Sequence, residues 1–489
     1  MAAAWSVLLP TEVWQIVFGY LPCVAARKCL SVSHFFHDLA APLLFATVRI
    51  EFGCWKAGYG LIEKPPGGSS ERRTCCILLR IITDHVFASY IKHLHVLAFS
   101  GGDRALELCL LTKAVNALRN LHTFRWYTTH KLCMIPDTAL LETLTSSCIR
   151  LREYALPLQC ADALSALKNV SAHSLNIHAL PQDTLWHSRM VGHIYGPHRR
   201  PFVALLEAHS GALVQLSIPG TAVWDCPAHI LSNLSHLEIH GAGDLAHVVE
   251  HCAQLKSLHI SFRDAISKAN EASATLAENP TALPNLTHLK LRFTPPAECL
   301  EGLLRFIGLK KNLRCLDWND QCFTNMDLSP LLSVLPSLSE LEVLGIDLRM
   351  NEILDDFAHF KHSVPKRVTA LRLCLVYGFH QQPLPEGRSW TEMWECLPDL
   401  AFLSINDDEG DPIAKTCDLV APARSLQFVA HRENLCEVFR TNQDPVLSPP
   451  WSHTKAMFRS VDDFGCEDWE WLMRGHSYAL LEELSRGSS

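Results

Sequence analysis

The first stretch of the chain has the apolar spacing of a short amphipathic helix. Apolar residues recur three and four positions apart, so they would share one wide stripe of a helix: Val13, Ile16, Val17, Tyr20 and Leu21. Pro10 suits the first helical turn, and Pro22 ends the helix. Two further short helices are predicted over residues 24–30 and 33–39, the second with Ser33 as its N-cap.

These three helices would form a unit of about 40 residues, which is too small to bury all of its apolar side chains. Units of this size usually need a metal, disulfides or a partner for stability. The stretch has no spacing typical of metal ligands or disulfides. We therefore expect another protein, or the following domain, to cover part of its apolar surface.

After the helices the pattern changes to the alternation that is typical of β-strands. Val48, Ile50 and Phe52 repeat with period two, which predicts a first strand joined directly to the helical unit. Residues 63–73, EKPPGGSSERR, are rich in Pro, Gly, Ser and charge, and we expect them to form an exposed loop.

A pattern L-x-x-L-x-L then recurs along most of the chain, at steps of 21 to 32 residues from Leu216 onward. Its middle apolar positions are Leu94, Phe124, Tyr154, Leu216, Leu237, Leu258, Leu289, Leu316, Leu341, Leu371 and Leu403. A weaker copy lies at Leu426 and Phe428. Between residues 157 and 212 the register is weak, although the stretch SLNIH could hold one more strand.

This pattern resembles leucine-rich repeats of irregular length that lack the usual Asn after the strand. The resemblance implies an α/β solenoid with parallel strands on its concave side and helices on its convex side. We predict a tail over residues 1–8, the helical unit over 9–46, the solenoid over 47–430, and a C-terminal cap and tail over 431–489. The alternative is a globular α/β domain with leucine-rich strands.

Side chains that flank the apolar pair of each repeat would point onto the concave face, because side chains alternate across a strand. We expect Lys290, Asp317 and Glu342 to form a lateral charge ladder, with Arg372 beyond it. A charge-patterned groove of this kind could select a protein substrate; the alternative is a solvated face whose exposed ion pairs contribute only about 0–1 kcal/mol. The candidate substrate-binding residues are His236, Glu238, His259, Lys290, Arg292, Asp317, Glu340, Glu342 and Arg372.

The C-terminal part begins with a Pro-rich break at residues 441–451. One or two amphipathic helices are predicted after it, bearing Trp469, Trp471, Leu472, Tyr478 and Leu481. Solenoids need an end cap, which is the role we expect. The alternative is an acidic helix that docks on another protein.

Composition and charge limit the classes of partner that the protein is expected to bind. The net charge of the 489 residues is −8, and no Lys/Arg cluster favours nucleic acid or an anionic membrane as a partner. No apolar run approaches the roughly 20 residues of a membrane span, and the first residues lack a basic signal region, so we expect an intracellular protein, cytoplasmic or nuclear. The 19 cysteines contain no C-x-x-C pair and the 26 histidines no H-E-x-x-H motif, so we expect free thiols, no metal and no cofactor.

The helical unit also resembles a known family. Its order L-P-x-E-V-x-x-x-V-F-x-x-L-P from Leu9 to Pro22, followed by C-x-x-V-S-x-x-F-x-x-L from Cys29 to Leu39, resembles the F-box. Followed by leucine-rich repeats, it is similar to fungal-type F-box proteins, the substrate receptors of Skp–cullin–F-box ubiquitin ligases. The resemblance implies a Skp-type adaptor as partner and, through it, a cullin.

The resemblance places the adaptor on Leu9, Pro10, Glu12, Val13, Val17, Leu21, Val32, Ser33 and Phe36. Which of these residues face the adaptor, and which belong to the core of the helical unit, stays open at this point. The alternative is a three-helix cap that only seals the end of the repeats.

An enzyme would need a catalytic constellation, and the sequence contains no P-loop, no G-x-S-x-G motif and no informative carboxylate pair. We therefore expect a non-catalytic recognition subunit that binds a protein substrate. The alternatives are an interaction scaffold whose F-box acts outside ubiquitination and an unrecognised hydrolase with a Cys–His pair formed in space.

Overall fold

The computed structural model divides the chain into two compact units. Unit 1 comprises residues 1–182 and 196–213, and unit 2 comprises residues 183–195 and 214–489. The structure describes residues 9–21, 23–53, 69–98, 104–128, 134–169, 171–178, 188–241, 245–261, 266–319, 329–349, 360–376, 394–407, 416–431, 434–441, 444–452, 455–456 and 459–476.

Unit 1 begins with three short helices, as the apolar spacing predicts: α1 (Thr11–Gly19), α2 (Cys23–Cys29) and α3 (His34–Leu44). Ser33 is the N-cap of α3, and its hydroxyl accepts a hydrogen bond from the backbone N–H of Phe36 at 3.2 Å. The third helix runs five residues further than predicted and passes through Pro42. Pro42 cannot donate a backbone hydrogen bond within this helix, and Leu39, Ala40 and Ala41 before it are buried.

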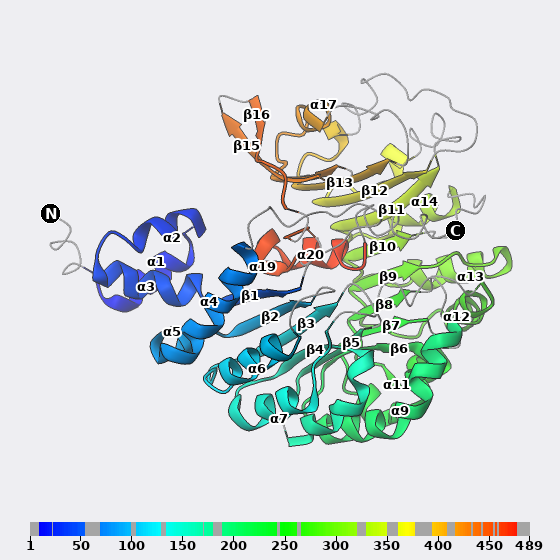
Figure 1. Ribbon diagram of the computed structural model, residues 1–489. Helices are drawn as coiled ribbons and strands as arrows, with labels where there is room; N and C mark the ends of the chain where they lie inside the picture. The colour runs from blue at the N-terminus through cyan, green and yellow to red at the C-terminus, as the bar shows by residue number, and fades with distance from the viewer. Residues whose placement is uncertain are drawn as a thin grey trace. The chain divides into compact units, whose positions relative to one another are not determined.

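The rest of unit 1 is a parallel sheet in which each strand pairs with the next along the chain (Figure 1). Its strands are β1 (Thr47–Phe52), β2 (His93–Ala98), β3 (Thr123–Thr128), β4 (Glu153–Pro157) and β5 (Ser174–His178). Its helices are α4 (Ser69–Thr83), α5 (His85–Tyr90), α6 (Arg104–Val115), α7 (Thr138–Ser147) and the 3-10 helix η2 (Leu158–Asn169). Helix α9 (Ser188–His209) has residues in both units.

Unit 2 repeats the same order of strand, helix and parallel strand. Its parallel strands are β6 (Gln215–Pro219), β7 (His236–His240), β8 (Ser257–Ser261), β9 (His288–Arg292), β10 (Cys315–Asn319), β11 (Val343–Arg349), β12 (Ala370–Val376), β13 (Phe402–Asp407) and β14 (Phe428–His431). Two antiparallel strands, β15 (Asn434–Thr441) and β16 (Asp444–Leu447), follow β14.

The helices that connect the parallel strands of unit 2 lie on one face of its sheet (Figure 1), and we call the opposite face the inner face. These elements are the 3-10 helices η3 (Gly220–Asp225) and η4 (Leu335–Ser337) and the helices α10 (Ala228–Leu231), α11 (Ala246–His251), α12 (Ile266–Glu278), α13 (Ala297–Gly308), α14 (Ser329–Val334) and α17 (Thr416–Val420). Two further helices, α19 (Val461–Phe464) and α20 (Glu467–Met473), follow β16.

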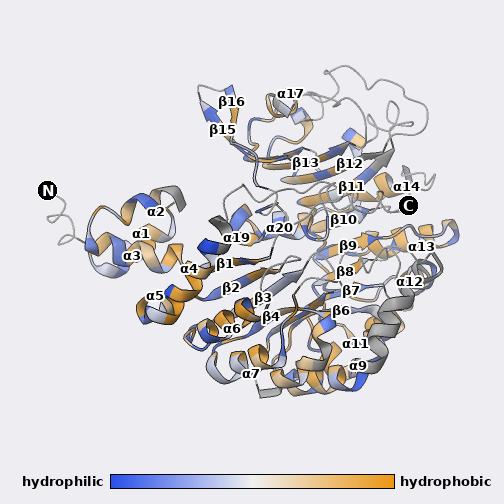
Figure 2. Ribbon diagram, in the orientation of Figure 1, coloured by the Kyte–Doolittle hydropathy of each residue, from blue (hydrophilic) through white to orange (hydrophobic). Residues whose placement is uncertain are grey.

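The apolar pair of each repeat forms the core between strands and helices, which confirms the predicted α/β repeat architecture. Leu289, Leu316 and Leu371 are fully buried, and apolar residues run through the strands and helices of both units (Figure 2). The weak stretch does hold one more strand, β5, whose Leu175 and Ile177 are buried.

One repeat has a different register from the predicted one. Strand β11 starts at Val343 and pairs Leu344 with Leu316, and Ile346 with Trp318. The core residues of this strand are therefore Leu344 and Ile346, and the predicted pair Leu341 and Val343 was three residues out of register. The stretch LSELEVLGI contains two overlapping copies of the pattern, and the neighbouring strands decide between them.

One other expectation changes. Helix α4 begins at Ser69, so part of the predicted loop at residues 63–73 is helical, and its residues 63–68 lie outside the described residues. No helix in the described part of the chain is long and apolar enough to cross a membrane.

The register of β11 can be tested by comparing two substitutions. Leu344→Ala should lower the free energy of unfolding by about 2–4 kcal/mol, because it leaves a cavity in the core. Glu342→Ala should change it by less than about 1 kcal/mol, because this partly exposed carboxylate precedes the strand and pairs with Arg367. Urea unfolding followed by tryptophan fluorescence measures the stability of both variants. A larger destabilisation by Glu342→Ala than by Leu344→Ala would support the register that places Leu341 and Val343 in the core.

Candidate functional site

The first helix leaves an apolar face open to solvent. Leu9, Val13, Ile16, Val17 and Tyr20 share this face by their spacing, and all five are exposed, up to 62% for Ile16 and 85% for Tyr20. Val32, in the turn between α2 and α3, is also exposed, by 53%. We call these six residues the open apolar face; exposed apolar surface of this kind marks interaction sites in many proteins.

The other side of α1 forms the small core of the helical unit. Phe18 is buried and stacks on Phe36, with ring centroids 5.6 Å apart, and Trp14 meets Phe36 edge to face at 5.3 Å. Leu21 packs against the same core. This core contains Trp14, Phe18, Phe35 and Phe36, whereas Tyr20 remains on the open apolar face.

The residues predicted from the F-box resemblance therefore fall into two groups. Six are exposed: Leu9, Pro10, Glu12, Val13, Val17 and Val32. Three are half-buried: Leu21 and Phe36 in the core of the helices, and Ser33 as the cap of α3. The prediction did not select Ile16 and Tyr20, although both belong to the apolar stripe that the sequence shows.

A row of polar residues crosses the inner face of unit 2 at the central position of each strand. Strand pairing places these residues side by side in this order: Ser217, Glu238, His259, Lys290, Asp317, Gly345, Arg372 and Ser404. The predicted neighbours Lys290 and Asp317 are in register. Glu342 is not part of the row, because the register of β11 puts Gly345 there.

The centre of this row is a buried charge network. Lys290 Nζ lies 3.1 Å from Asp317 Oδ2, and neither side chain has exposed surface. Arg372 donates two hydrogen bonds to Asp317 Oδ1, at 2.9 and 3.0 Å, and one to Asp347 Oδ1 at 2.9 Å. Burial alone would raise the pKa of Asp317, but the neighbouring Arg372, His476 and Lys290 hold it well below its ordinary value.

Gly345 makes the contact between Asp317 and Arg372 possible. These two residues are on β10 and β12, and Gly345 lies between them on β11. A Cβ atom at residue 345 would stand 2.1 Å from Asp317 Oδ1 and 3.0 Å from Arg372 Nε. The ion pair occupies the space that any other residue would fill.

We predict that Gly345→Ala lowers the free energy of unfolding by at least about 2 kcal/mol, because the added methyl group must break the buried ion pair or move the strands. Gly308→Ala is the matched control, since its Cβ would meet its nearest neighbour, Val334 Cγ1, at an ordinary 3.5 Å. Urea unfolding of both variants measures the difference. Equal stabilities would mean that the pair adapts without cost.

The C-terminal helices lie on the inner face: α20 covers this network, and Phe464 of α19 packs on Phe428 of β14, the last parallel strand. Trp471, Leu472 and Met473 of α20 pack with one row of buried residues from successive strands. That row comprises Cys315, Val343, Ala370, Phe402 and Phe428. The parallel sheet ends in the antiparallel strands β15 and β16, which belong to the range 431–489 predicted as cap and tail. Of the residues predicted for these helices, Tyr478 and Leu481 lie outside the described residues.

Lys290 holds the end of α20 on the inner face. Its ammonium group donates to the backbone carbonyls of Trp471, Leu472 and Arg474, at 2.6, 2.9 and 2.9 Å. These carbonyls end a helix and need donors. Burial lowers the pKa of Lys290 to about 8, although the attraction of Asp317 opposes this change.

Further contacts extend the attachment of this segment along the row. Arg292 donates to the carbonyl of Gly475, and His476 Nε2 lies 2.7 Å from Asp317 Oδ2. At the start of α20, Asp468 contacts His288 and Arg314. We call residues 459–476 the C-terminal segment; it is bound to the inner face at both ends of α20.

We predict that Lys290→Met loosens the C-terminal segment. Amide hydrogens of residues 467–476 should exchange at least about tenfold faster, which corresponds to about 1.4 kcal/mol of local opening free energy. Lys310→Met is the control: Lys310 is also buried, but it donates to Pro280 and Ala282 carbonyls. Hydrogen exchange read by mass spectrometry measures both variants. Unchanged exchange in Lys290→Met would show that the apolar contacts alone hold the segment.

The predicted substrate-binding residues are thus placed in two different environments. Five are buried on the inner face: His259, Lys290, Arg292, Asp317 and Arg372. Glu238 is nearly buried and lies 2.7 Å from His259 Nδ1. His236, Glu340 and Glu342 keep exposed surface, and the two glutamates pair with Arg367 before strand β11.

Unit 1 has its own polar row, which the sequence analysis did not select. Arg49, His95 and Arg125 are neighbours at the central positions of β1, β2 and β3. Arg125 lies 3.6 Å from Glu153, with both side chains more than one-third exposed. Burial, together with the positive charges of Arg125 and Arg49, holds the pKa of His95 well below its ordinary value.

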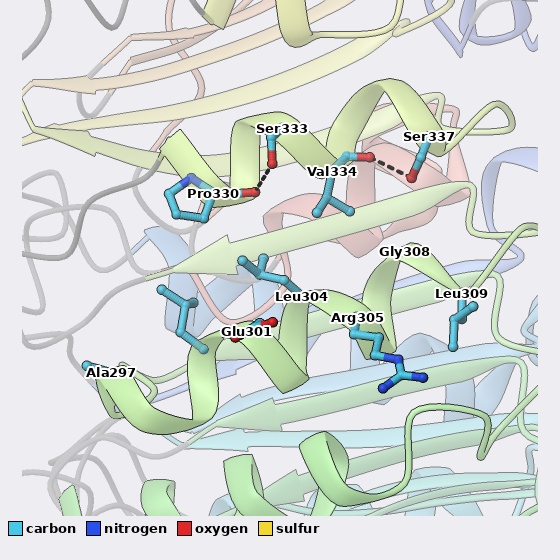
Figure 3. Close-up of a pocket in the computed structure, with 11 residues that line it drawn as sticks. Ala297, Glu301, Leu304, Arg305, Gly308, Leu309, Pro330, Ser333, Val334 and Ser337 are labelled. Atoms are coloured by element: carbon cyan, nitrogen blue, oxygen red, sulfur yellow. Dashed lines mark hydrogen bonds between the residues drawn. The ribbon is translucent and has the colours of Figure 1, made fainter.

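A groove of about 720 Å³ separates α13 and α14 on the helical side of unit 2 (Figure 3). Glu301, Leu304 and Arg305 line it from α13, and Val334 lines it from α14. Its two serines donate to backbone carbonyls of α14, and its lining includes no histidine or cysteine.

Comparisons with known proteins give similarity to solved structures alone. No protein-family model matches the chain, and no curated protein sequence is significantly similar to it. The leucine-rich repeat-containing protein LegL7 from Legionella pneumophila aligns over 88% of this chain and 99% of its own, at 12% identity and a TM-score of 0.29.

Two solved complexes also contain similar chains. A chain of the Rad7 and Elc1 complex in yeast aligns over 78% of this chain and 93% of its own, at 14% identity and a TM-score of 0.40. A chain of the TLR13–ssRNA13 complex aligns over 72% of this chain and 56% of its own, at 11% identity and a TM-score of 0.26. The fold assignment therefore depends on the strand order and register described above.

Proposed function

We propose that this protein is the substrate-recognition subunit of a Skp–cullin–F-box ubiquitin ligase. The observation that carries the proposal is the open apolar face of α1. A unit of three short helices exposes a stripe of large apolar side chains, including Tyr20, while Phe18 and Phe36 stack in its own core. Such a surface is most stable when a partner covers it.

The identity of the partner follows from the order of residues on this face. Leu9, Pro10, Val13 and Val17 belong to the stretch that resembles the F-box, whose partner is a Skp-type adaptor linked to a cullin. Ile16 and Tyr20 extend the same stripe and would contribute the largest contact areas. Leu21 and Phe36 would act indirectly, by supporting α1 from the core.

The repeat units would bind the protein substrate. In this proposal each unit offers its own candidate contacts: His236, Glu340 and Glu342 in unit 2, and Arg49 and Arg125 in unit 1. The buried residues of unit 2 would instead hold the C-terminal segment. The chain would contribute no reactive group, because holding a substrate close to a ubiquitin-charged enzyme accelerates transfer by proximity.

We predict that Val17→Asp lowers the amount of a co-expressed Skp-type adaptor that co-purifies with the chain at least tenfold relative to the wild type. The charge would be buried in the interface without a partner. Tyr20→Asp should act in the same way, and at 85% exposure this substitution leaves the core of the helices intact. Val86→Asp is the control, since Val86 is 63% exposed on α5. Retention of the adaptor by both α1 variants would refute the proposal.

A second measurement separates the ligase from an interaction scaffold. Substrates captured by the wild-type chain should be polyubiquitinated in a reconstituted reaction with adaptor, cullin and charged enzyme, and should stay unmodified with Tyr20→Asp. Adaptor binding without any ubiquitin transfer would favour a scaffold role.

A further inference from the structure

We infer that unit 2 contains a binding site for a divalent transition-metal ion of the zinc type, formed by His288, Cys315 and Asp468. The three ligand atoms would be Nε2 of His288, Sγ of Cys315 and one carboxylate oxygen of Asp468. Imidazole nitrogen, thiolate sulfur and carboxylate oxygen are the three donor types that zinc uses in proteins.

Strand register brings the first two ligands together. His288 and Cys315 are the first residues of β9 and β10 and are direct partners in the parallel ladder. Adjacent strands lie about 4.8 Å apart, so side chains on the same face can share one ion. Asp468 comes from the first turn of α20, which lies over these strands.

The distances are close to those of a metal centre. The three ligand atoms lie within 4.8 Å of one another, and His288 Nε2 is 3.3 Å from Asp468 Oδ1. Tetrahedral zinc with bonds of about 2.0–2.3 Å requires ligand–ligand distances of roughly 3.3–3.6 Å. The nitrogen and oxygen already meet this requirement, and the sulfur, which lies within 4.8 Å of both, has to approach them by up to roughly 1.2 Å.

The surroundings orient the ligands as in known metal sites. His288 Nδ1 lies 2.8 Å from the hydroxyl of Thr287, and the edge-to-face contact with Trp471 fixes the ring plane. A metal-bound histidine usually uses its second ring nitrogen in this way. Cys315 is a free, fully buried thiol, while His288 and Asp468 keep 16% and 20% exposure, which leaves access for the ion and a water ligand.

Arg314 is the group that competes with the ion. Its guanidinium lies 2.7 Å from Asp468 Oδ1 and balances this charge when no metal is bound. The side chain is 43% exposed and lies 3.9 Å from Glu342, so it has a second carboxylate to pair with. Coordination would release the thiol proton to solvent, and the thiolate and carboxylate would then neutralise the two charges of the ion.

The site would fasten the C-terminal segment to the sheet. Two ligands, His288 and Cys315, belong to β9 and β10. The third, Asp468, lies 154 positions after Arg314, the residue that precedes Cys315. The ion would therefore add a bond between sheet and α20 at the end opposite to Lys290.

The test is a Co²⁺ titration of the full-length chain after removal of metals with a chelator. We expect one equivalent of Co²⁺ to give a thiolate-to-cobalt charge-transfer band, which Zn²⁺ then abolishes by displacement. Cys315→Ser and Asp468→Asn should each remove the band or weaken binding at least tenfold. Cys374→Ser is the matched control, since Cys374 lies on the same sheet, on β12, outside the cluster.

Arg314→Met supplies an independent readout that a structural role of the cluster would not produce. Removing the competing positive charge should tighten Co²⁺ binding severalfold. Circular dichroism establishes that each variant is folded, and Asp468→Asn decides the test if Cys315→Ser fails to fold. Absence of the band in the wild type, or an equal band in both ligand variants, would overturn the inference.

Discussion

The buried ammonium group of Lys290 is the constraint around which unit 2 is arranged. A charge without exposed surface costs several kcal/mol unless it is paired and hydrogen-bonded. Asp317 supplies the opposite charge, and the end of α20 supplies three carbonyl oxygens. Asp317 also binds Arg372, which can reach it only because residue 345 is glycine. Lys290, Asp317 and Arg372 therefore link β9, β10 and β12 to one another, and Lys290 links them to the C-terminal segment.

The two units differ in the kind of surface that they bury. In unit 2 a row of charged residues that could have faced water is enclosed by the chain itself. In unit 1 a stripe of large apolar residues that could have been enclosed is left open on α1. Charges that are already paired within the chain gain little from a partner. Covering an open apolar stripe, in contrast, lowers the free energy. This contrast is why the proposed function depends on α1.

The sequence predicts the strands well because two apolar residues per repeat determine both the position and the face of a strand. It fails where the same stretch offers two such pairs, as Leu341 with Val343 and Leu344 with Ile346 do; only the neighbouring strands decide between them. Helical spacing likewise identifies the apolar stripe on α1. It does not separate the exposed residues of the predicted adaptor site from those in the core, because Phe36 reaches the core from a different helix.

The position of the C-terminal segment could not be predicted for a different reason. The spacing of Trp469, Trp471 and Leu472 predicts a helix with an apolar side, and α20 is that helix. Its binding surface, however, is provided by residues far away in the sequence, and no local pattern encodes such a contact. The same holds for the cluster of His288, Cys315 and Asp468, whose spacing matches no metal motif.

The long separation between Lys290 and its carbonyl partners has a consequence during synthesis. These partners lie 181 to 184 positions later in the chain. When β9 and β10 leave the ribosome, the nascent polypeptide cannot yet provide them, and the ammonium group stays hydrated. The inner face of unit 2 is therefore completed after translation of the last repeats, and until then the half-made sheet presents its row of charges to water.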